Sequence, residues 1–181
     1  MPEAPADVAE LTISQFDKAL HDRSAFSCGF EPIDKFLKEA LTDHIKSGYL
    51  TAFMATDEEQ KEVIGFYTLS AFAISPDHIE TPKRPRPPPT IPVTYIKAVA
   101  VHEDRQGKGI GRALVVHALR QAMEISEKVG SMAIVLDVMR DESFERRFAF
   151  YEELGFQPMN DPDNVDRVYI SMNDVRATLG T

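Results

Sequence analysis

The sequence predicts a layered α/β protein, and three observations lead to this class. Segments rich in aromatic and β-branched residues alternate with segments whose apolar residues recur every three or four positions, as expected for strands and amphipathic helices. Residues 132–138, MAIVLDV, form an almost continuous apolar run, which is typical of a central strand covered on both faces. The 181 residues, 43% hydrophobic and 27% charged, suffice for one sizeable core. We therefore expect a single domain over residues 1–181, built from packed layers.

The first half of the chain is expected to contain a strand, a helix and a hairpin. Residues 11–16 have the composition of a strand. After Pro32, which suits the first turn of a helix, apolar residues fall at helical spacing as far as Gly48; they are Ile33, Phe36, Leu37, Ala40, Leu41 and Ile45. Two segments of strand composition follow, residues 49–56 and 62–74, and the polar residues between them predict a hairpin.

A proline-rich loop separates this hairpin from the second half. Residues 75–92 hold too many prolines for a helix or a sheet ladder, because each proline fixes φ and lacks an N–H donor. Beyond this loop we expect, in order, a strand over residues 93–103, a helix that ends near Lys128 before Gly130, the central strand, a helix over residues 142–156 and a last strand over residues 167–172.

Composition and charge exclude several classes of protein. The only cysteine, Cys28, rules out an intramolecular disulfide and a cysteine-rich zinc site, so we expect no metal and a reducing compartment. No apolar run reaches the roughly 18 residues of a membrane span, and the acidic N-terminus does not resemble a signal peptide. We therefore expect a cytoplasmic protein without a membrane partner. The net charge of −9 argues against a broadly basic nucleic-acid surface, although it allows a local basic patch.

The stretch RQGKGIGRALV, residues 105–115, predicts an anion-binding loop at the start of a helix. The first N–H groups of a helix lack intrahelical partners, and the peptide dipoles place about half a positive charge there. Glycine lets a phosphate approach these amides closely. The stretch is not a Walker loop, because Arg112 and Ala113 stand where lysine and serine or threonine are needed, and its glycine spacing is not that of a Rossmann fingerprint.

Two motifs together resemble the GNAT superfamily of N-acetyltransferases. They are Gln-x-x-Gly-x-Gly at Gln106, Gly109 and Gly111, after an apolar strand, and FYEELGF at residues 150–156. The resemblance implies a mixed, mostly antiparallel central sheet with helices on both faces, and acetyl-CoA as the cofactor. It also implies that the pantetheine arm pairs with the main chain of Val99, Ala100 and Val101, and that the diphosphate contacts Gln106, Gly107, Lys108, Gly109, Ile110, Gly111 and Arg112.

The same resemblance assigns a catalytic role to Tyr151. Many members of the superfamily protonate the departing thiolate from this position, and general-acid help of this kind is worth about 10² to 10⁴ in rate. The alternative is that Tyr151 only packs on the apolar stripe of its helix. Four residues remain candidates for the base that activates the amine, and the sequence does not choose among them; they are His102, Glu103, His117 and Asp137.

The amine acceptor is expected to have a low pKa. A lysine amine is neutral in roughly one molecule in 2,500 at pH 7, whereas an α-amine is neutral in roughly one in seven, so an α-amine needs less help from a base. Residues 21–48 and 84–115 are similar to the GNAT toxins of bacterial toxin–antitoxin pairs, which acetylate the α-amine of aminoacyl-tRNA. That resemblance implies that the partner is a ribbon-helix-helix antitoxin and that Cys28 has a structural role. It leaves open whether the protein forms a homodimer.

The chain departs from this toxin pattern at two positions. Ala98 stands where an arginine usually precedes the cofactor strand, and Arg147 stands where alanine is usual, four residues before Tyr151. RNA binding needs a basic surface, for which the sequence offers Lys46, Lys83, Arg84, Arg86, Arg146 and Arg147. Three functions therefore remain open: acetylation of a small-molecule or protein amine, acetylation of aminoacyl-tRNA, and binding of CoA without catalysis.

Overall fold

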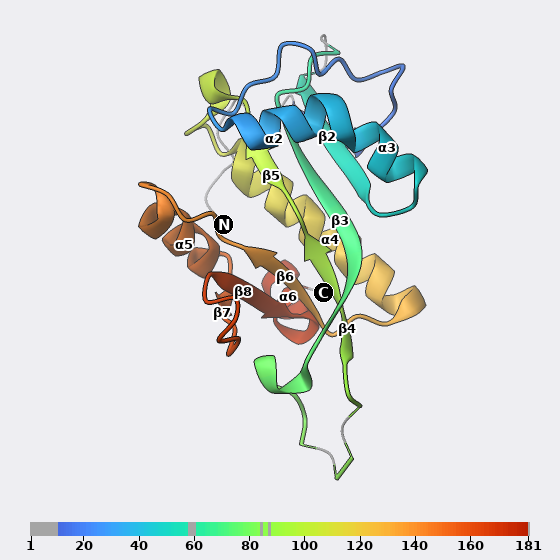
Figure 1. Ribbon diagram of the computed structural model, residues 1–181, viewed down its shortest axis with the longest axis vertical. Coiled ribbons are helices and arrows are strands. Elements are labelled where there is room, and N and C mark those ends of the chain that lie inside the picture. The colour runs from blue at the N-terminus through green and yellow to red at the C-terminus, as the bar shows by residue number, and fades with distance from the viewer. Residues whose placement is uncertain (1–10, 58–60, 84, 87, 181) are drawn as a thin grey trace. The chain divides into compact units, whose positions relative to one another are not determined.

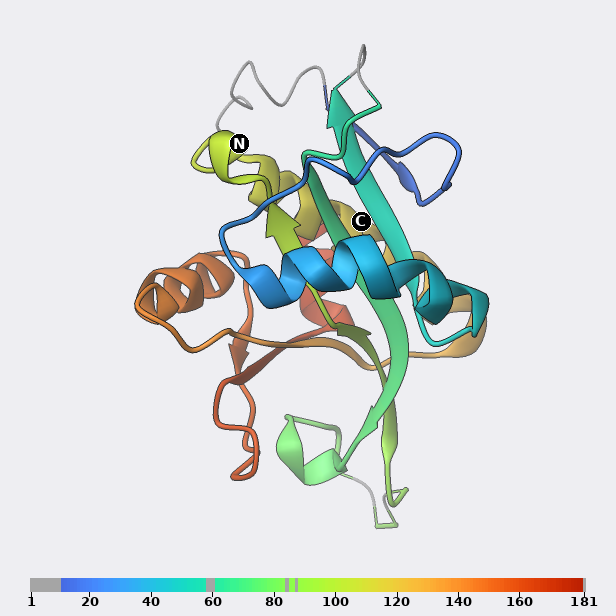
Figure 2. The same cartoon turned by 45° about the horizontal axis from the view of Figure 1, so that its top comes forward.

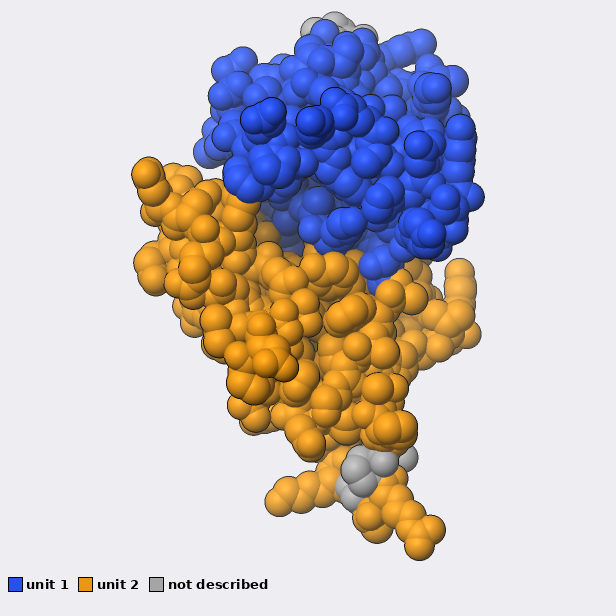
Figure 3. Space-filling model, in the orientation of Figure 1, with its two compact units in different colours: residues 1–70, 97–118 blue, residues 71–96, 119–181 orange. Residues whose placement is uncertain are grey.

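The computed structural model describes residues 11–57, 61–83, 85–86 and 88–180. The chain divides into two compact units, drawn in different colours in Figure 3. Unit 1 comprises Met1–Ser70 and Lys97–Ala118, and unit 2 comprises Ala71–Ile96 and Leu119–Thr181. Arg84, one of the cations expected in the basic patch, lies outside the described residues.

Unit 1 contains an antiparallel sheet (Figure 1). β1 (Leu11–Gln15) pairs with β2 (Thr51–Asp57), β2 pairs with β3 (Gly65–Ile74), and β3 pairs with β5 (Val99–Val101). In the register of the second pair, Thr51 lies opposite Leu69 and Ala55 opposite Gly65. This pairing confirms the predicted first strand and the predicted hairpin.

Helices cover both faces of the sheet in unit 1 (Figures 1 and 2). On one face, Met54 of β2 shares a buried cluster with Leu37 and Leu41, which follow α2 (Glu31–Lys35). On the other face, the ring of Phe53 lies 5.4 Å from that of His117 in α4 (Ile110–Val129). Because Phe53 and Met54 are neighbours in a strand, their side chains point to opposite faces, so both faces are covered.

The helix predicted after Pro32 is confirmed, but it is interrupted by a π-helical segment. α2 continues into η1 (Phe36–Ala40), which has π-helical hydrogen bonding, and then into α3 (Leu41–Lys46). The N–H of Leu41 donates to the carbonyl of Phe36, five residues back. The carbonyl of Leu37, its usual α-helical partner, accepts instead from Nη1 of Arg23 at 2.6 Å. A side chain from the preceding loop therefore takes part in the helix's hydrogen bonding.

The prediction of one strand over residues 93–103 is wrong. The segment forms two strands, β4 (Ile91–Ile96) in unit 2 and β5 in unit 1. In unit 1, buried Thr68 donates its N–H to the carbonyl of Ala98 at 3.0 Å, and its Oγ1 accepts from the N–H of Ala98 at 3.3 Å. One of these two hydrogen bonds is accepted by the side chain of Thr68, and the alternation of apolar residues gives no sign of such a contact. The break between β4 and β5 was therefore not expected from the sequence.

Unit 2 contains the central strand that the apolar run predicted. β6 (Ala133–Asp137) pairs in parallel with β4 and antiparallel with β8 (Arg167–Ser171), and β7 (Gln157–Pro158) pairs with β8. α5 (Phe144–Glu153) confirms the helix expected over residues 142–156. α6 (Met172–Leu179) was not expected, although Ser171 accepts from the N–H of Asp174 and Gly180 ends the helix in the left-handed conformation, so both capping residues were visible.

The described strands form a mixed, mostly antiparallel arrangement with helices, which confirms the predicted fold class. None of the helices in the described ranges is both long and apolar enough to pass through a bilayer.

Gly65 is packed so closely in unit 1 that an added side chain would clash with its neighbours. A Cβ there would lie 2.9 Å from Cδ1 of Leu114 and 3.2 Å from the carbonyl oxygen of Ala100. We expect Gly65→Val to lower the free energy of unfolding by about 1–3 kcal/mol because the strand and α4 must separate. Gly111→Ala is the control, since its Cβ would make only an ordinary 3.7 Å contact. Urea unfolding measures both, and equal stability of Gly65→Val and wild type would contradict this account.

Candidate active site

The loop between β5 and α4 has the backbone geometry of an anion cradle. β5 leads through η3 (Glu103–Arg105) to residues 106–112, which we call the diphosphate loop. Gly107 has φ of 76° and Gly109 has φ of 85°, a left-handed conformation that favours glycine. A Cβ on Gly107 would meet no atom within 4 Å, so this side of the loop is open. The glycines are therefore needed for the path of the chain, and the space beside them suits a bulky anion.

The diphosphate loop ends in the first turn of a long helix. α4 has 20 residues and begins with Ile110, Gly111 and Arg112. The N–H of Ala113 is already bonded to the carbonyl of Gly109 at 3.0 Å, which marks where helical hydrogen bonding begins. N–H groups in a first turn and the positive end of the helix dipole favour an anion. The residues present therefore fit the diphosphate of a coenzyme, and all of the predicted cofactor residues lie in unit 1.

Gln106 supports the diphosphate loop through its side chain. Its Nε2 donates to the carbonyl of Val101 at 3.0 Å and to the carbonyl of Cys28 at 3.0 Å. Its backbone N–H donates to the carbonyl of Glu103 at 3.3 Å. The side chain therefore joins the end of β5 to a loop from the N-terminal part of the chain, and this contact gives the glutamine of the motif a positioning role.

The N-terminal loop that receives Gln106 is itself fixed by a carboxylate. Asp34 of α2 accepts from the N–H of Cys28 at 2.8 Å and from the hydroxyl of Ser27 at 3.2 Å. The carbonyl of Ser27 in turn accepts from the N–H of Glu103 at 2.8 Å. Sequence reasoning missed Ser27 and Asp34, and the only available signal was the Phe-x-Cys-Gly pattern close to a helix start.

Cys28 has the environment of a structural residue. Burial, assisted by the nearby carboxylate of Asp34, raises the pKa of its thiol to about 11. A thiol with this pKa stays protonated at neutral pH, and the thiolate is the nucleophilic form. The prediction that Cys28 is structural agrees with this protonation state and with the hydrogen bond that its carbonyl accepts from Gln106.

Tyr151 lies in unit 2, in the last turn of α5. Its ring contacts those of Phe150 and Phe156, with centroids 5.2 and 5.6 Å away. Its carbonyl accepts from the N–H of Phe156 while the N–H of Gly155, with φ of 92°, bonds to Glu152, which is a Schellman helix end. The Leu-Gly-Phe of the second motif therefore ends the helix and fixes the ring of Tyr151.

Burial raises the pKa of Tyr151 to about 12, and the positive charge of Arg147 acts weakly in the opposite direction. The guanidinium of Arg147 is held in place by the two carboxylate oxygens of Asp141, at 2.5 and 2.8 Å, and by the carbonyl of Met139. The arginine that replaces the usual alanine is therefore bound to its own helix start, and Tyr151 stays protonated throughout the physiological pH range.

Three of the four candidate bases lie in unit 1, each in a different setting. Nδ1 of His102 accepts from the N–H of Asp104 at 3.2 Å, and its ring packs edge-on against Phe26. Nδ1 of His117 lies 2.7 Å from the hydroxyl of Tyr67, whose pKa is raised by burial. Glu103 has an exposed side chain. Both histidines therefore have one ring nitrogen in a local contact.

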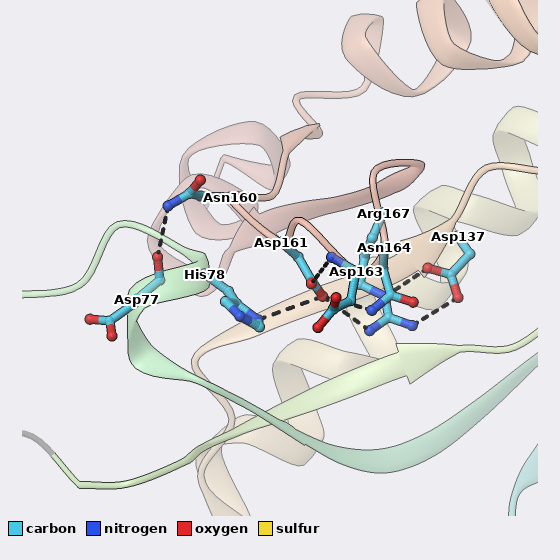
Figure 4. Close-up of polar contacts among 8 residues, drawn as sticks. All are labelled: Asp77, His78, Asp137, Asn160, Asp161, Asp163, Asn164 and Arg167. Atoms are coloured by element: carbon cyan, nitrogen blue, oxygen red, sulfur yellow. Dashed lines mark hydrogen bonds and ion pairs between the residues drawn. The ribbon is translucent and has the colours of Figure 1, made fainter.

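The fourth candidate, Asp137, belongs to a charged network in unit 2. Nε and Nη2 of Arg167 donate to its two carboxylate oxygens at 2.6 and 3.0 Å (Figure 4). Tyr95 donates its hydroxyl to the same carboxylate at 2.8 Å. Nη1 of Arg167 also lies 3.7 Å from the carboxylate of buried Asp161, and Nδ1 of His78 lies 3.6 Å from the same carboxylate. Both carboxylate oxygens of Asp137 are therefore occupied by hydrogen bonds from Arg167 and Tyr95, which disfavours Asp137 as a base.

The described members of the expected basic patch are divided between the two units. Lys46 lies in unit 1, whereas Lys83, Arg86, Arg146 and Arg147 lie in unit 2, and Arg147 is paired with Asp141.

Within the described ranges, no group of three or more histidine, cysteine, aspartate or glutamate side chains could hold a metal ion.

Comparison with known proteins identifies the class of this site. Residues 49–158 match the acetyltransferase (GNAT) domain family. A probable toxin TacT from Sinorhizobium fredii is 31% identical over 98% of this chain and 99% of its own length. A tRNA-acetylating toxin from Mycobacterium tuberculosis is 29% identical over 88% of this chain and 91% of its own.

Solved structures agree with this result. AtaT complexed with acetyl-methionyl-tRNAfMet has a TM-score of 0.82 and 25% identity, over 94% of this chain and 99% of that one. AtaTR bound with AcCoA has a TM-score of 0.78 and 25% identity, over 96% and 99%. The fold and the glycine loop thus define a CoA-dependent acyltransferase, and the chain belongs to the GNAT acetyltransferase family. It is an enzyme that transfers the acetyl group of acetyl-CoA to an amine.

The support of the diphosphate loop can be tested through Gln106. Gln106→Leu leaves the carbonyls of Cys28 and Val101 without their side-chain donor, so we expect the KM for acetyl-CoA to rise about tenfold. kcat at saturating acetyl-CoA should change much less. Gln106→Glu is the matched control of similar shape, and it should also fail because a carboxylate cannot donate. Steady-state kinetics in which Gln106→Leu keeps the wild-type KM would contradict this role.

Proposed function

We propose that this enzyme acetylates the α-amine of aminoacyl-tRNA and is the toxin of a toxin–antitoxin pair. The observation that supports this most directly is the 31% identity to a probable toxin over nearly the whole of both chains. The names of two further relatives, a tRNA-acetylating toxin and AtaT with acetyl-methionyl-tRNAfMet, support the same acceptor. In this proposal residues 1–181 act as a single GNAT domain. A ribbon-helix-helix antitoxin and a second copy of the chain complete the proposed set of partners.

The acetyl-CoA site in this proposal lies in unit 1. Bound acetyl-CoA supplies an activated acetyl thioester. The main chain of Val99, Ala100 and Val101 pairs with its pantetheine arm, and the diphosphate loop receives its phosphates. One N–H of β5 polarises the thioester carbonyl, in the manner of an oxyanion hole. The side chains of Lys108 and Arg112 add positive charge next to the phosphates.

Tyr151 is the general acid in this proposal. The leaving group is a thiolate with an ordinary pKa near 8.5, so a phenol with a pKa of about 12 is always protonated when it is needed. Burial raises the pKa of every acid that ionises to an anion, including a thiol formed in apolar surroundings. The desolvation that raises the pKa of the phenol therefore raises the pKa of the thiol as well, so the difference between the two pKa values becomes smaller.

The proposed acceptor reduces the need for a base. Because a large fraction of an α-amine is already neutral near pH 7, the amine can attack the thioester carbonyl without a dedicated proton acceptor. As the N–C bond forms and the C–S bond breaks, Tyr151 would donate its proton to the departing sulfur, and the proton lost by the attacking nitrogen would pass to solvent, from which the phenolate of Tyr151 regains a proton. An attack without a dedicated base is in keeping with the contacts inside each unit: in unit 2 Asp137 is hydrogen-bonded to Arg167, and in unit 1 both candidate histidines have a ring nitrogen in a local contact.

Acetyl transfer to charged tRNA tests the substrate assignment. Purified protein should transfer the labelled acetyl group of acetyl-CoA to a set of aminoacyl-tRNAs, and mass spectrometry should place the label on the α-amine. The same aminoacyl-tRNA whose amino group is already blocked is the control and should stay unlabelled. Labelling of polyamines or protein lysines, with none on any aminoacyl-tRNA, would replace this function with acetylation of another amine.

Replacing Tyr151 tests the acid. We expect Tyr151→Phe to lower kcat by about 10² to 10⁴ and to leave the dissociation constant of acetyl-CoA, measured by calorimetry, nearly unchanged. Tyr49→Phe is the matched control, because Tyr49 is 69% exposed. Since the phenol stays protonated up to a pH of about 12, wild-type kcat should show no alkaline decline from this group between pH 8 and 10. An unchanged kcat in Tyr151→Phe would remove Tyr151 from the mechanism.

A further inference from the structure

Unit 1 contains a basic pocket that the acetyl-transfer chemistry does not use. It is an open hollow of about 380 Å³ beside the turn that follows β1. Four cations line it, Lys18, Arg23, Lys38 and Lys61, and the only acidic residue of its lining is Asp22. This excess of positive charge stands in contrast to the net charge of −9 for the whole chain.

Arg23 gives the pocket a fixed and uncompensated charge. Its guanidinium lies over the ring of Phe16, at 4.8 Å, and donates to the carbonyl of Leu37 and to Oγ1 of Thr42. These three partners are neutral, and Arg23 forms no ion pair within the described part of the chain. Burial accordingly lowers its pKa, whereas Arg167, bonded to Asp137, has its pKa raised. A half-buried cation without a carboxylate is stabilised when an anion approaches.

The carboxylate of the pocket is already engaged. One oxygen of Asp22 accepts from both the N–H and the hydroxyl of Ser24, at 2.9 and 2.7 Å. The backbone of Asp22 is bonded to the segment that holds Lys61, since its N–H donates to the carbonyl of Lys61 at 2.8 Å. The backbone of Lys61 is therefore held in place by Asp22, while the carboxylate of Asp22 is hydrogen-bonded to Ser24.

The cations come from three separate segments. Lys18 lies in a turn held by the carboxylate of Asp17, which accepts from the N–H of Ala19 at 2.8 Å. Lys38 lies in the π-helical segment, and Lys61 precedes β3. Exposed lysine side chains on independent supports suit a ligand with several spaced negative charges better than one small anion.

We propose that this pocket binds the phosphodiester backbone of RNA, with Arg23 as the fixed cation and Lys18, Lys38 and Lys61 as its flexible partners. The proposal rests on the proposed function, because aminoacyl-tRNA is the RNA that the enzyme would meet. The contacts are to the backbone, so they position the acceptor and supply affinity without reading its bases. They are independent of the acetyl-CoA site, which uses different residues of the same unit.

The test uses the triple variant Lys18→Gln, Lys38→Gln and Lys61→Gln in the full-length enzyme. Its matched control, Lys35→Gln, Arg120→Gln and Lys128→Gln, removes the same charge from exposed cations outside the pocket. We expect the KM for aminoacyl-tRNA to rise at least about tenfold in the pocket variant only. The slope of log affinity against log salt should become shallower by up to about 0.9 for each lost phosphate contact.

Two further measurements distinguish loss of RNA binding from a general loss of activity. The KM for acetyl-CoA, and the rate with a minimal aminoacyl-adenosine acceptor that lacks the tRNA body, should stay at wild-type values in the pocket variant. Binding of uncharged tRNA, followed by fluorescence anisotropy, tests the pocket even when no aminoacyl-tRNA is acetylated, so a failure of the proposed function is recognised separately. Equal loss in both triple variants, or no loss in either, would overturn the proposal. Wild-type tRNA binding by the pocket variant, with loss of inorganic phosphate binding, would also overturn it and indicate a site for free phosphate.

Discussion

The two hydrogen bonds donated by Gln106 are the interaction on which the cofactor site depends. A single amide nitrogen joins the end of β5, through Val101, to the N-terminal loop, through Cys28. This link adds a side-chain restraint to the left-handed turns at Gly107 and Gly109, where it matters because glycine costs the most conformational entropy to order. The glycines allow the backbone to adopt the left-handed turns, and the hydrogen bonds of the glutamine hold the loop in place. This gives a physical reason for both residue types in one short motif.

Sequence reasoning predicted the backbone of this site better than its supports. Glycine spacing and strand composition are local signals, so the sequence alone predicted the diphosphate loop, β6 and the hairpin. Asp34 binds the amide of Cys28, six residues earlier, and Arg23 binds the carbonyl of Leu37, fourteen residues later, and neither contact belongs to a periodic pattern. The π-helical segment and the break before β5 have the same origin, since each depends on a hydrogen bond from outside the local repeat.

The arginines of this chain differ in whether a carboxylate accompanies them, and in unit 1 Arg105 is paired with Asp57 whereas Arg23 is not. In unit 2 the guanidinium of Arg167 is matched by Asp137 and Asp161 (Figure 4). The guanidinium of Arg147 is matched by Asp141, so both of these cations stabilise the fold. In unit 1 the guanidinium of Arg23 meets only neutral groups among the described residues. An acidic protein can thus keep a local affinity for anions, provided that a few cations lack carboxylate partners. The formal charge of the chain therefore says little about whether it binds RNA.

Ala98, which stands where the toxin pattern has an arginine, is packed in the core of unit 1. Ala98 is only 8% exposed and belongs to the same buried cluster as Phe66 and Leu37. A guanidinium at this position would be placed among apolar side chains, at a cost that only a buried carboxylate or several hydrogen bonds could offset. The adjacent Lys97 instead directs its ammonium over the ring of Phe36, at 5.0 Å. The strand that leads to the cofactor loop therefore keeps a neighbouring cation, while the core beneath it stays apolar.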